Sequence, residues 1–370
     1  MSASRLFEPL KLGNVTLQHR IAMAPLTRFR ADENHVPLPF VKEYYAQRAS
    51  TPGTLIISEA TLVSKKAGGY GLVPGIWTKE QIAGWKEVTD AVHAKGSFMY
   101  LQLWALGRVA DPNNAAKEGI EIKAPSAIPQ AEGATVPQEL TQDEIKSFVA
   151  DYAQAARNAV AAGFDGVEIH GANGYLIDQF NQDTANQRTD AYGGSVENRS
   201  RFAVEVASAV VDAVGADKVG IRLSPYSTFQ GMRMADPIPQ FTDLARKLKA
   251  LGLAYLHLVE ARISGNATIE TTEKVDFLID EWDNVSPVLI AGGFTPESAK
   301  RAVDDEYKGK DVVIVFGRHF ISTPDLPFRV QKGIELTPYD RNKFYNAGEE
   351  EGYITWPFSE EFQSQQNAKI

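Results

Sequence analysis

The stretch GVEIHGA, residues 166–172, has the pattern of a short buried strand that ends in a histidine and two small residues. Apolar runs of the same kind recur along the chain, bounded by glycine and proline. Continuous runs of this type are typical of strands buried on both faces, as in a parallel sheet. The eight runs are residues 20–26, 54–63, 97–104, 166–172, 218–225, 253–261, 287–293 and 311–317.

A helical pattern follows each of these runs. In residues 141–163 the apolar side chains recur every three or four positions, which predicts an amphipathic helix. Thr141 with Glu144, and Thr78 with Gln81, have the spacing of capping boxes at helix N-termini. Strands that alternate with helices, with no linker-like stretch between them, favour one α/β fold, the (β/α)8 TIM barrel, over an open doubly wound sheet.

We predict one domain over residues 1–370. Residues 105–140, rich in alanine, proline and glycine, interrupt the third βα loop and are expected to form an excursion over the barrel mouth. Residues 335–370 are polar and aromatic and are expected to pack as a C-terminal tail. The active site of such barrels lies at the C-terminal ends of the strands. The polar residues at the strand exits are therefore the candidates for function.

Composition excludes several classes of protein. The 370 residues are 44% hydrophobic and 23% charged, as in an ordinary globular protein. The chain has no cysteine, which excludes disulfides and thiolate metal sites, and its net charge of −9 argues against a nucleic-acid surface. No apolar run approaches the roughly 18 residues of a membrane span. We expect a cytoplasmic protein, and its oligomeric state, monomer or homodimer, is left open.

Other chemistries of this fold can be compared with the strand exits. The six histidines include no His-x-His pair, so no metal site is predicted, and no strand ends in a Schiff-base lysine. The glycine fingerprint of a Rossmann dinucleotide site is absent. A glycoside hydrolase needs two facing carboxylates. Glu59, Glu168 and Glu260 keep that alternative open.

The seventh and eighth predicted strands both end in glycine. Gly292 and Gly293 follow PVLIA, and Gly317 and Arg318 follow VVIVF. Glycine lets backbone N–H groups approach a phosphate, and arginine adds charge-assisted hydrogen bonds. TIM barrels often bind phosphate at these two loops, so we predict a phosphate-bearing ligand here.

The segment HGANGYL, with RTDAYGGSVENRSRF after it, resembles the Old Yellow Enzyme family of FMN-dependent ene-reductases. The similarity extends from FEPLKLGNVTLQHRIAMAPLTR through AGGYGLVPGIW, LQLW and GIRLSPY to FGRHFISTPDLPFR and YDRNKFY, and so covers nearly the whole chain. The resemblance implies non-covalent FMN, with NAD(P)H as the hydride donor and NADPH favoured. It also implies small-molecule substrates, namely activated alkenes of the α,β-unsaturated carbonyl or nitro class, reduced by ping-pong kinetics.

The resemblance implies roles for the strand-exit residues in binding FMN. Arg222 would lie beside flavin N1 and the C2 carbonyl, where reduction leaves negative charge. Thr27 would hydrogen-bond the C4 carbonyl, and Gln102 would pair with the pyrimidine edge. Ala60 stands where some members carry a glycine beside the flavin. The implied cofactor-binding residues are Thr27, Ala60, Gln102, Arg222, Gly293, Gly317 and Arg318.

The resemblance also implies the catalytic residues. His170 and Asn173 would donate hydrogen bonds to the substrate oxygen, where charge develops as hydride reaches the β-carbon, and Tyr175 would protonate the α-carbon. Glu168 is expected to point away from His170 and to serve the barrel structure. Aromatic residues would wall the substrate pocket: Tyr70, Trp104, Phe229 and Tyr345. A flavin-binding barrel that has lost turnover, and a dedicated biosynthetic role on one enal, remain open alternatives.

Overall fold

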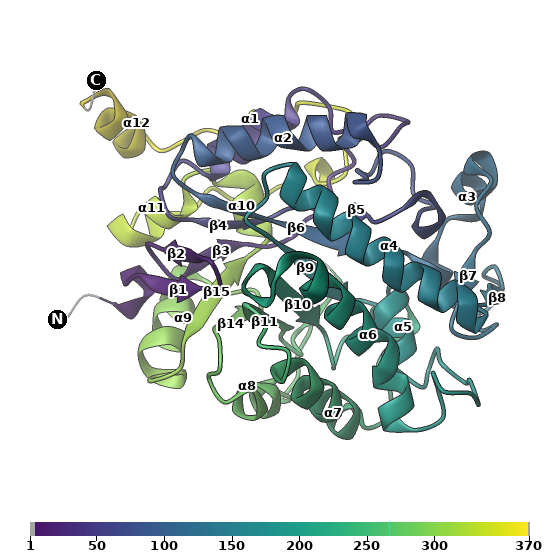
Figure 1. Ribbon diagram of the computed structural model, residues 1–370. Coiled ribbons are helices and arrows are strands. Elements are labelled where there is room, and N and C mark those ends of the chain that lie inside the picture. The colour runs from purple at the N-terminus through teal and green to yellow at the C-terminus, as the bar shows by residue number, and fades with distance from the viewer. Residues whose placement is uncertain (1–3, 266, 369–370) are drawn as a thin grey trace.

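Eight parallel strands close into a barrel in the computed structural model, which describes residues 4–265 and 267–368 (Figure 1). The barrel strands follow one another in chain order, and the last strand pairs with the first through Ile314 and Ile21. They are β3 (Ile21–Met23), β4 (Leu55–Ile57), β6 (Phe98–Trp104), β9 (Gly166–Gly171), β10 (Val219–Leu223), β11 (Tyr255–Val259), β14 (Val288–Ala291) and β15 (Val312–Phe316). Each predicted run contains one of these strands, and the (β/α)8 prediction is confirmed.

Helices follow the barrel strands and surround them (Figure 1). The predicted capping boxes are present: the Thr78 and Thr141 side chains accept from the backbone N–H groups of Gln81 and Glu144, whose side chains accept in return. The helices after successive barrel strands are α1 (Val41–Arg48), α2 (Lys79–His93), α4 (Gln142–Ala161), α6 (Val196–Val214), α7 (Pro237–Lys249), α8 (Asp276–Trp282) and α9 (Pro296–Arg301), with α10 (Arg318–Ser322) and α11 (Leu326–Lys332) after β15.

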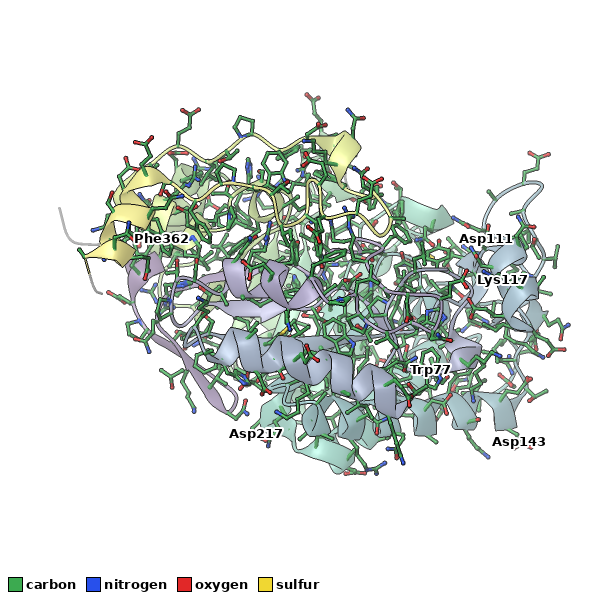
Figure 2. The ribbon with its side chains drawn as sticks, turned by 90° about the horizontal axis from the view of Figure 1, so that it is seen from above. Trp77, Asp111, Lys117, Asp143, Asp217 and Phe362 are labelled. Atoms are coloured by element: carbon green, nitrogen blue, oxygen red, sulfur yellow. The ribbon has the colours of Figure 1, made fainter. Side chains whose placement is uncertain are left out.

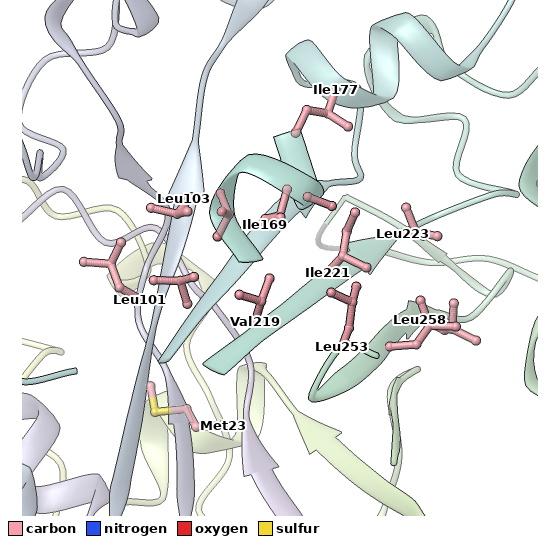
Figure 3. Packing of buried hydrophobic residues seen from close by; sticks show 14 of the residues in the cluster. Met23, Leu101, Leu103, Ile169, Ile177, Val219, Ile221, Leu223, Leu253 and Leu258 are labelled. Atoms are coloured by element: carbon pink, nitrogen blue, oxygen red, sulfur yellow. The ribbon is translucent and has the colours of Figure 1, made fainter. Parts of the chain in front are cut away.

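Apolar side chains are buried on both faces of the barrel strands. Those that face outward pack under the helices, and Figure 3 shows Leu101, Ile169 and Ile221 among them. A second cluster fills the interior, where a hairpin of β1 (Leu10–Leu12) and β2 (Val15–Leu17) joins the inward-facing residues. Each fully buried aliphatic side chain contributes about 1.5–3 kcal/mol relative to an exposed one, so these two layers supply most of the stability of the barrel.

The barrel interior is polar on one side only. Arg222 on β10 pairs in register with His170 on β9 and with His257 on β11, while Gln102 on β6 pairs with Glu168 on β9. All five side chains are buried. The corresponding interior positions of β14, β15 and β3 are apolar: Leu289, Val313 and Ala22. This side of the barrel can therefore face a polar ligand that enters from the C-terminal ends of the strands.

Two further segments flank the barrel. Residues 105–140 contain η3 (Gly107–Val109), α3 (Pro112–Glu118), β7 (Lys123–Ala124) and β8 (Gln138–Glu139), and they lie at one side of the barrel (Figure 1). Figure 2 labels Asp111 and Lys117 in this part, and Phe362 on α12 (Glu360–Asn367) at the opposite end. The last two residues of the predicted tail lie outside the described residues. Among the described helices, none is long and apolar enough to cross a membrane.

Candidate active site

A cavity of about 540 Å³ opens at the C-terminal ends of the barrel strands. This volume is in the usual range for a small-molecule site. Its wall is formed by the exits of β3, β6, β9, β10, β11, β14 and β15, together with Phe344 and Tyr345 from the C-terminal tail. The location agrees with the general position of active sites in TIM barrels.

Most of the residues predicted from the sequence line this cavity. They are Thr27, Tyr70, Trp104, Asn173, Tyr175, Arg222, Phe229, Gly293, Gly317, Arg318 and Tyr345. Three predicted residues do not line it. His170 is buried behind Tyr175, Gln102 is bonded to Glu168 in the interior, and Ala60 packs in an apolar cluster with Trp104.

The glycines that follow β14 and β15 lie beside a fixed arginine. Gly293 has φ +64°, a conformation that favours glycine, and a Cβ there would lie 3.4 Å from the Arg318 guanidinium. Arg318 Nη2 donates to the Thr268 hydroxyl at 3.0 Å, and its guanidinium lies over the Tyr339 ring at 5.5 Å. These contacts hold the cation at the cavity wall, where it could bind a phosphate group.

Asn173 and Tyr175 occupy a sharp turn after β9. Asn173 has φ +59°, which asparagine tolerates better than most residues, and its backbone N–H donates to Ser224 Oγ at 2.8 Å. The Tyr175 ring meets the rings of Trp104 and His170 edge-on, with centroids 5.0 and 4.9 Å apart. Burial raises the pKa of the Tyr175 phenol, so the phenol keeps its proton at neutral pH.

His170 is held as a neutral imidazole. Burial lowers its pKa well below the ordinary value, and the Arg222 charge lowers it further. His170 Nδ1 accepts from the Ala172 backbone N–H at 3.4 Å. The proton of the neutral ring therefore lies on Nε2, which can only donate.

The orientation predicted for Glu168 is wrong. Residues two apart on a strand point to the same side, so Glu168 lies inside the barrel with His170 instead of pointing away. Its carboxylate accepts hydrogen bonds from three buried donors: Gln102 Nε2 at 2.8 Å, Tyr255 OH at 3.0 Å and His257 Nδ1 at 2.8 Å.

Neighbouring polar and charged groups keep the Glu168 carboxylate charged. Burial raises its pKa, but the opposing effects of His257, Arg222 and Gln102 are larger together, and the net shift is downward. Because the ionised carboxylate can only accept, the Gln102 amide must turn Nε2 towards it and leave Oε1 available as an acceptor. The two-residue spacing of Glu168 and His170 was the signal in the sequence that could have identified this group.

Arg222 provides a test of whether the site fits FMN. Its Nε is buried and has no hydrogen-bond partner among the described residues. Burial lowers the pKa of Arg222, and the Glu168 charge opposes that shift. A buried guanidinium N–H without a protein partner is favoured by an acceptor, which a ligand in this cavity can supply. The flavin pyrimidine ring offers carbonyl and N1 acceptors for Arg222, and the FMN phosphate matches the Gly293 and Arg318 region. The residues present therefore fit FMN.

Comparisons with known proteins identify the class. Residues 5–337 match the family model described as the NADH:flavin oxidoreductase / NADH oxidase family, and the chain belongs to that family. It is an FMN-dependent oxidoreductase of the Old Yellow Enzyme type, and a reduced nicotinamide is its hydride donor. These matches do not favour the glycoside hydrolase alternative.

Individual relatives are similar over their full length. The chain is 60% identical over 361 residues to chanoclavine-I aldehyde reductase fgaOx3 of Penicillium roqueforti, covering 97% of this chain and 98% of that protein. It is 54% identical over 366 residues to NADP-dependent oxidoreductase lnbE of Aspergillus flavus, covering 97% of each. The crystal structure of Old Yellow Enzyme from a Pichia species has a TM-score of 0.89 at 39% identity, covering 96% of this chain and 94% of that one.

Proposed function

We propose that this protein reduces the activated C=C bond of α,β-unsaturated carbonyl or nitro compounds in a ping-pong cycle with NADPH. The observation that carries the proposal is the phenol of Tyr175 at the cavity wall, next to Asn173 and against the His170 ring. The aldehyde reductase and NADP-dependent relatives support the carbonyl class and the choice of nicotinamide. The chemistry that bound FMN would supply is hydride transfer from the nicotinamide to the β-carbon of the alkene.

Residues that line the cavity, together with Gln102 and Ala60, which do not line it, would hold the cofactor in one orientation. Arg222 would donate to the N1 and C2-carbonyl edge, with Gln102 Oε1 near an N–H group of the same ring. Thr27 would bond the C4 carbonyl, and Ala60 would allow close approach of the ring. Gly293, Gly317 and Arg318 would bind the phosphate. The polar side of the barrel interior supports this orientation.

His170 and Asn173 would bind the substrate oxygen. The neutral His170 ring has its proton on Nε2, and the Asn173 amide lines the cavity, so each can donate one hydrogen bond. Negative charge grows on that oxygen as the β-carbon is reduced, and two fixed donors stabilise the transition state more than the ground state. Tyr70, Trp104, Phe229 and Tyr345 would exclude water around a flat substrate.

Tyr175 would complete the reaction as the general acid. Its O–H bond breaks as a new C–H bond forms at the α-carbon, and the electron pair stays on the phenolate oxygen, which solvent reprotonates. A high phenol pKa keeps the proton in place until the α-carbon becomes strongly basic.

We also propose that residues 105–140 and 335–370 belong to the same domain as the barrel, since Tyr345 lines the cavity and Arg108 bonds the Gln230 carbonyl.

The Tyr175→Phe variant tests this function. The aromatic ring remains against Trp104 and His170, so the pocket wall is kept and only the acid is removed. We expect NADPH to reduce the variant normally, and its reoxidation by 2-cyclohexenone to slow by about 10²–10⁴-fold. A nitroalkene should still reoxidise it quickly, because a nitronate is stable enough to leave and be protonated in water.

Stopped-flow reoxidation with the two substrates separates the alternatives. If enone and nitroalkene reactions slow equally, Tyr175 is only a pocket wall and the proton has another source. If the wild-type protein holds FMN but consumes no NADPH with either substrate, it is a flavin-binding barrel without turnover. The first result would reject the role of Tyr175, and the second would reject the proposed function.

A further inference from the structure

We infer that Gln230 is a positioning residue for the general acid: its side-chain amide donates to the Tyr175 oxygen and so directs the phenol proton into the cavity. The inference rests on the proposed role of Tyr175. Gln230 lies on η5 (Phe229–Gly231), in the loop after β10, and lines the cavity together with Tyr175. Its neighbour Phe229 is among the residues predicted from the sequence, whereas Gln230 is not.

The backbone of the β9 turn accommodates Gln230 at very short range. Gly174, which directly precedes Tyr175, has no side chain, and a Cβ there would lie only 2.8 Å from the Gln230 Cβ. The same added atom would lie 2.8 Å from the Met232 Cγ. Glycine at position 174 therefore allows the loop after β10 to pack directly on the turn that carries the acid.

The side-chain amide of Gln230 has a buried oxygen without a partner among the described residues. Its Oε1 is buried and accepts no hydrogen bond within the described part of the chain. Burial raises the pKa of the Tyr175 phenol, and the side-chain hydrogen bond from Gln230 lowers it, as expected when an amide N–H donates to the phenol oxygen. The donated bond also stabilises the phenolate that remains after the proton has gone to the α-carbon.

The loop that carries Gln230 is held in place by Arg108. This arginine is buried, and its Nη2 donates to the carbonyls of Gln230 at 3.2 Å and of Gly231 at 3.4 Å. Its Nη1 donates to the Pro129 carbonyl at 3.3 Å, so the same guanidinium also joins two parts of residues 105–140. Gly231 has φ +69°, and a Cβ there would lie 2.6 Å from the Gln130 carbonyl oxygen.

A loop held in this way keeps the amide aimed at the phenol before any substrate arrives. Gln230 itself has φ +60°, a conformation that costs energy for a residue other than glycine and that surrounding contacts must maintain. A pre-oriented donor adds no reorganisation cost when the proton moves. Because the Gln230 amide N–H occupies one side of the phenol oxygen, the phenol hydrogen points to the other side, into the cavity.

Two variants of nearly equal volume test the inference in the FMN-loaded protein. Gln230→Leu removes the donor, and enone reoxidation should slow by about tenfold or more, while the nitroalkene reaction changes little. Gln230→Glu replaces the donor with a group that accepts once ionised. Its enone rate should fall as pH rises through the carboxyl pKa and recover as pH falls, a profile absent in the wild type. Gln154→Leu, on the exposed face of α4, is the matched control.

A double-mutant cycle shows whether Gln230 acts through the phenol. In the Tyr175→Phe background, Gln230→Leu should slow the enone reaction no further. Equal slowing with both substrates, or full additivity with Tyr175→Phe, would overturn the inference and make Gln230 a wall residue. Failure of the proposed function is distinct, because the wild-type protein would then consume no NADPH with either substrate.

A spectroscopic measurement supports the test without turnover. In protein labelled with 13C at the tyrosine Cζ, the Tyr175 resonance is identified by its loss in Tyr175→Phe. Gln230→Leu should shift that resonance, since a hydrogen bond to the phenol oxygen changes the shielding of Cζ, and Gln154→Leu should not. An unshifted resonance in Gln230→Leu would mean that the bond does not exist.

Discussion

His19 at the N-terminal end of the barrel should make the protein sensitive to acid. The ring is 5% exposed; its Nδ1 accepts from the Ile21 N–H at 3.2 Å, and its Nε2 lies 3.0 Å from Thr54 Oγ1. The Thr54 hydroxyl donates to the Thr51 carbonyl, so it accepts from Nε2–H. Both ring nitrogens are therefore satisfied in the neutral form, and a second proton on Nδ1 would face another N–H group.

The size of the effect follows from the pKa. Burial lowers the pKa of His19 from 6.5 to about 4. Because the folded-state pKa is depressed, the stabilisation is complete above pH 6.5 and is lost as pH falls towards 4. The free energy of unfolding falls by about 2 kcal/mol at pH 5, and by about 3 kcal/mol once the pH is below both the unfolded-state and the folded-state pKa of His19.

The variant His19→Gln isolates this contribution, because an amide also offers one donor and one acceptor but does not titrate in this range. Urea unfolding of both proteins, at fixed excess FMN, gives the free energy of unfolding near neutral pH and near pH 5. The stability advantage of the wild type over His19→Gln should shrink by about 2 kcal/mol at the lower pH.

His93→Gln serves as the control with the opposite sign. The His93 ring bonds Asp165 at 2.9 Å, and that bond raises its pKa. The contribution of His93 to the free energy of unfolding is therefore present at low pH and lost as pH rises. The stability advantage of wild type over His93→Gln should grow on acidification. If the wild-type advantage over His19→Gln is the same at both pH values, His19 is not held neutral by burial.

Two further predictions concern the cofactor. Arg318→Ala should weaken FMN retention after gel filtration, measured as flavin fluorescence released by acid. Arg341 lies over the same Tyr339 ring as Arg318 but does not line the cavity, so Arg341→Ala should retain FMN. Glu168→Gln should make the reduction potential of bound FMN more positive, because the positive charge of Arg222 is no longer balanced and favours the reduced anion. Tyr255→Phe removes one donor but keeps the carboxylate, and its potential should stay close to that of the wild type.

Local patterns in the sequence were sufficient for the architecture. Apolar runs and capping boxes such as Thr141 with Glu144 depend on neighbours within a few residues, and the structure contains them where expected. The ends of the short strands were predicted less accurately. The single run predicted at 54–63 is divided into β4 and β5 (Thr61–Leu62). The candidate site could be predicted largely because HGANGYL and the other motifs resemble a known family.

Contacts between distant parts of the chain needed the folded barrel. Glu168 meets Gln102 and His257 only because closure of the barrel brings β6, β9 and β11 into register, and no local pattern encodes that pairing. Gln230 reaches the turn at Gly174 because Arg108, more than a hundred residues earlier, holds its loop. The sequence alone determined which side chains stand at the strand exits. Only the tertiary structure decided which of them form hydrogen bonds or interact as charges, since these interactions depend on distances across the barrel and not on spacing along the chain.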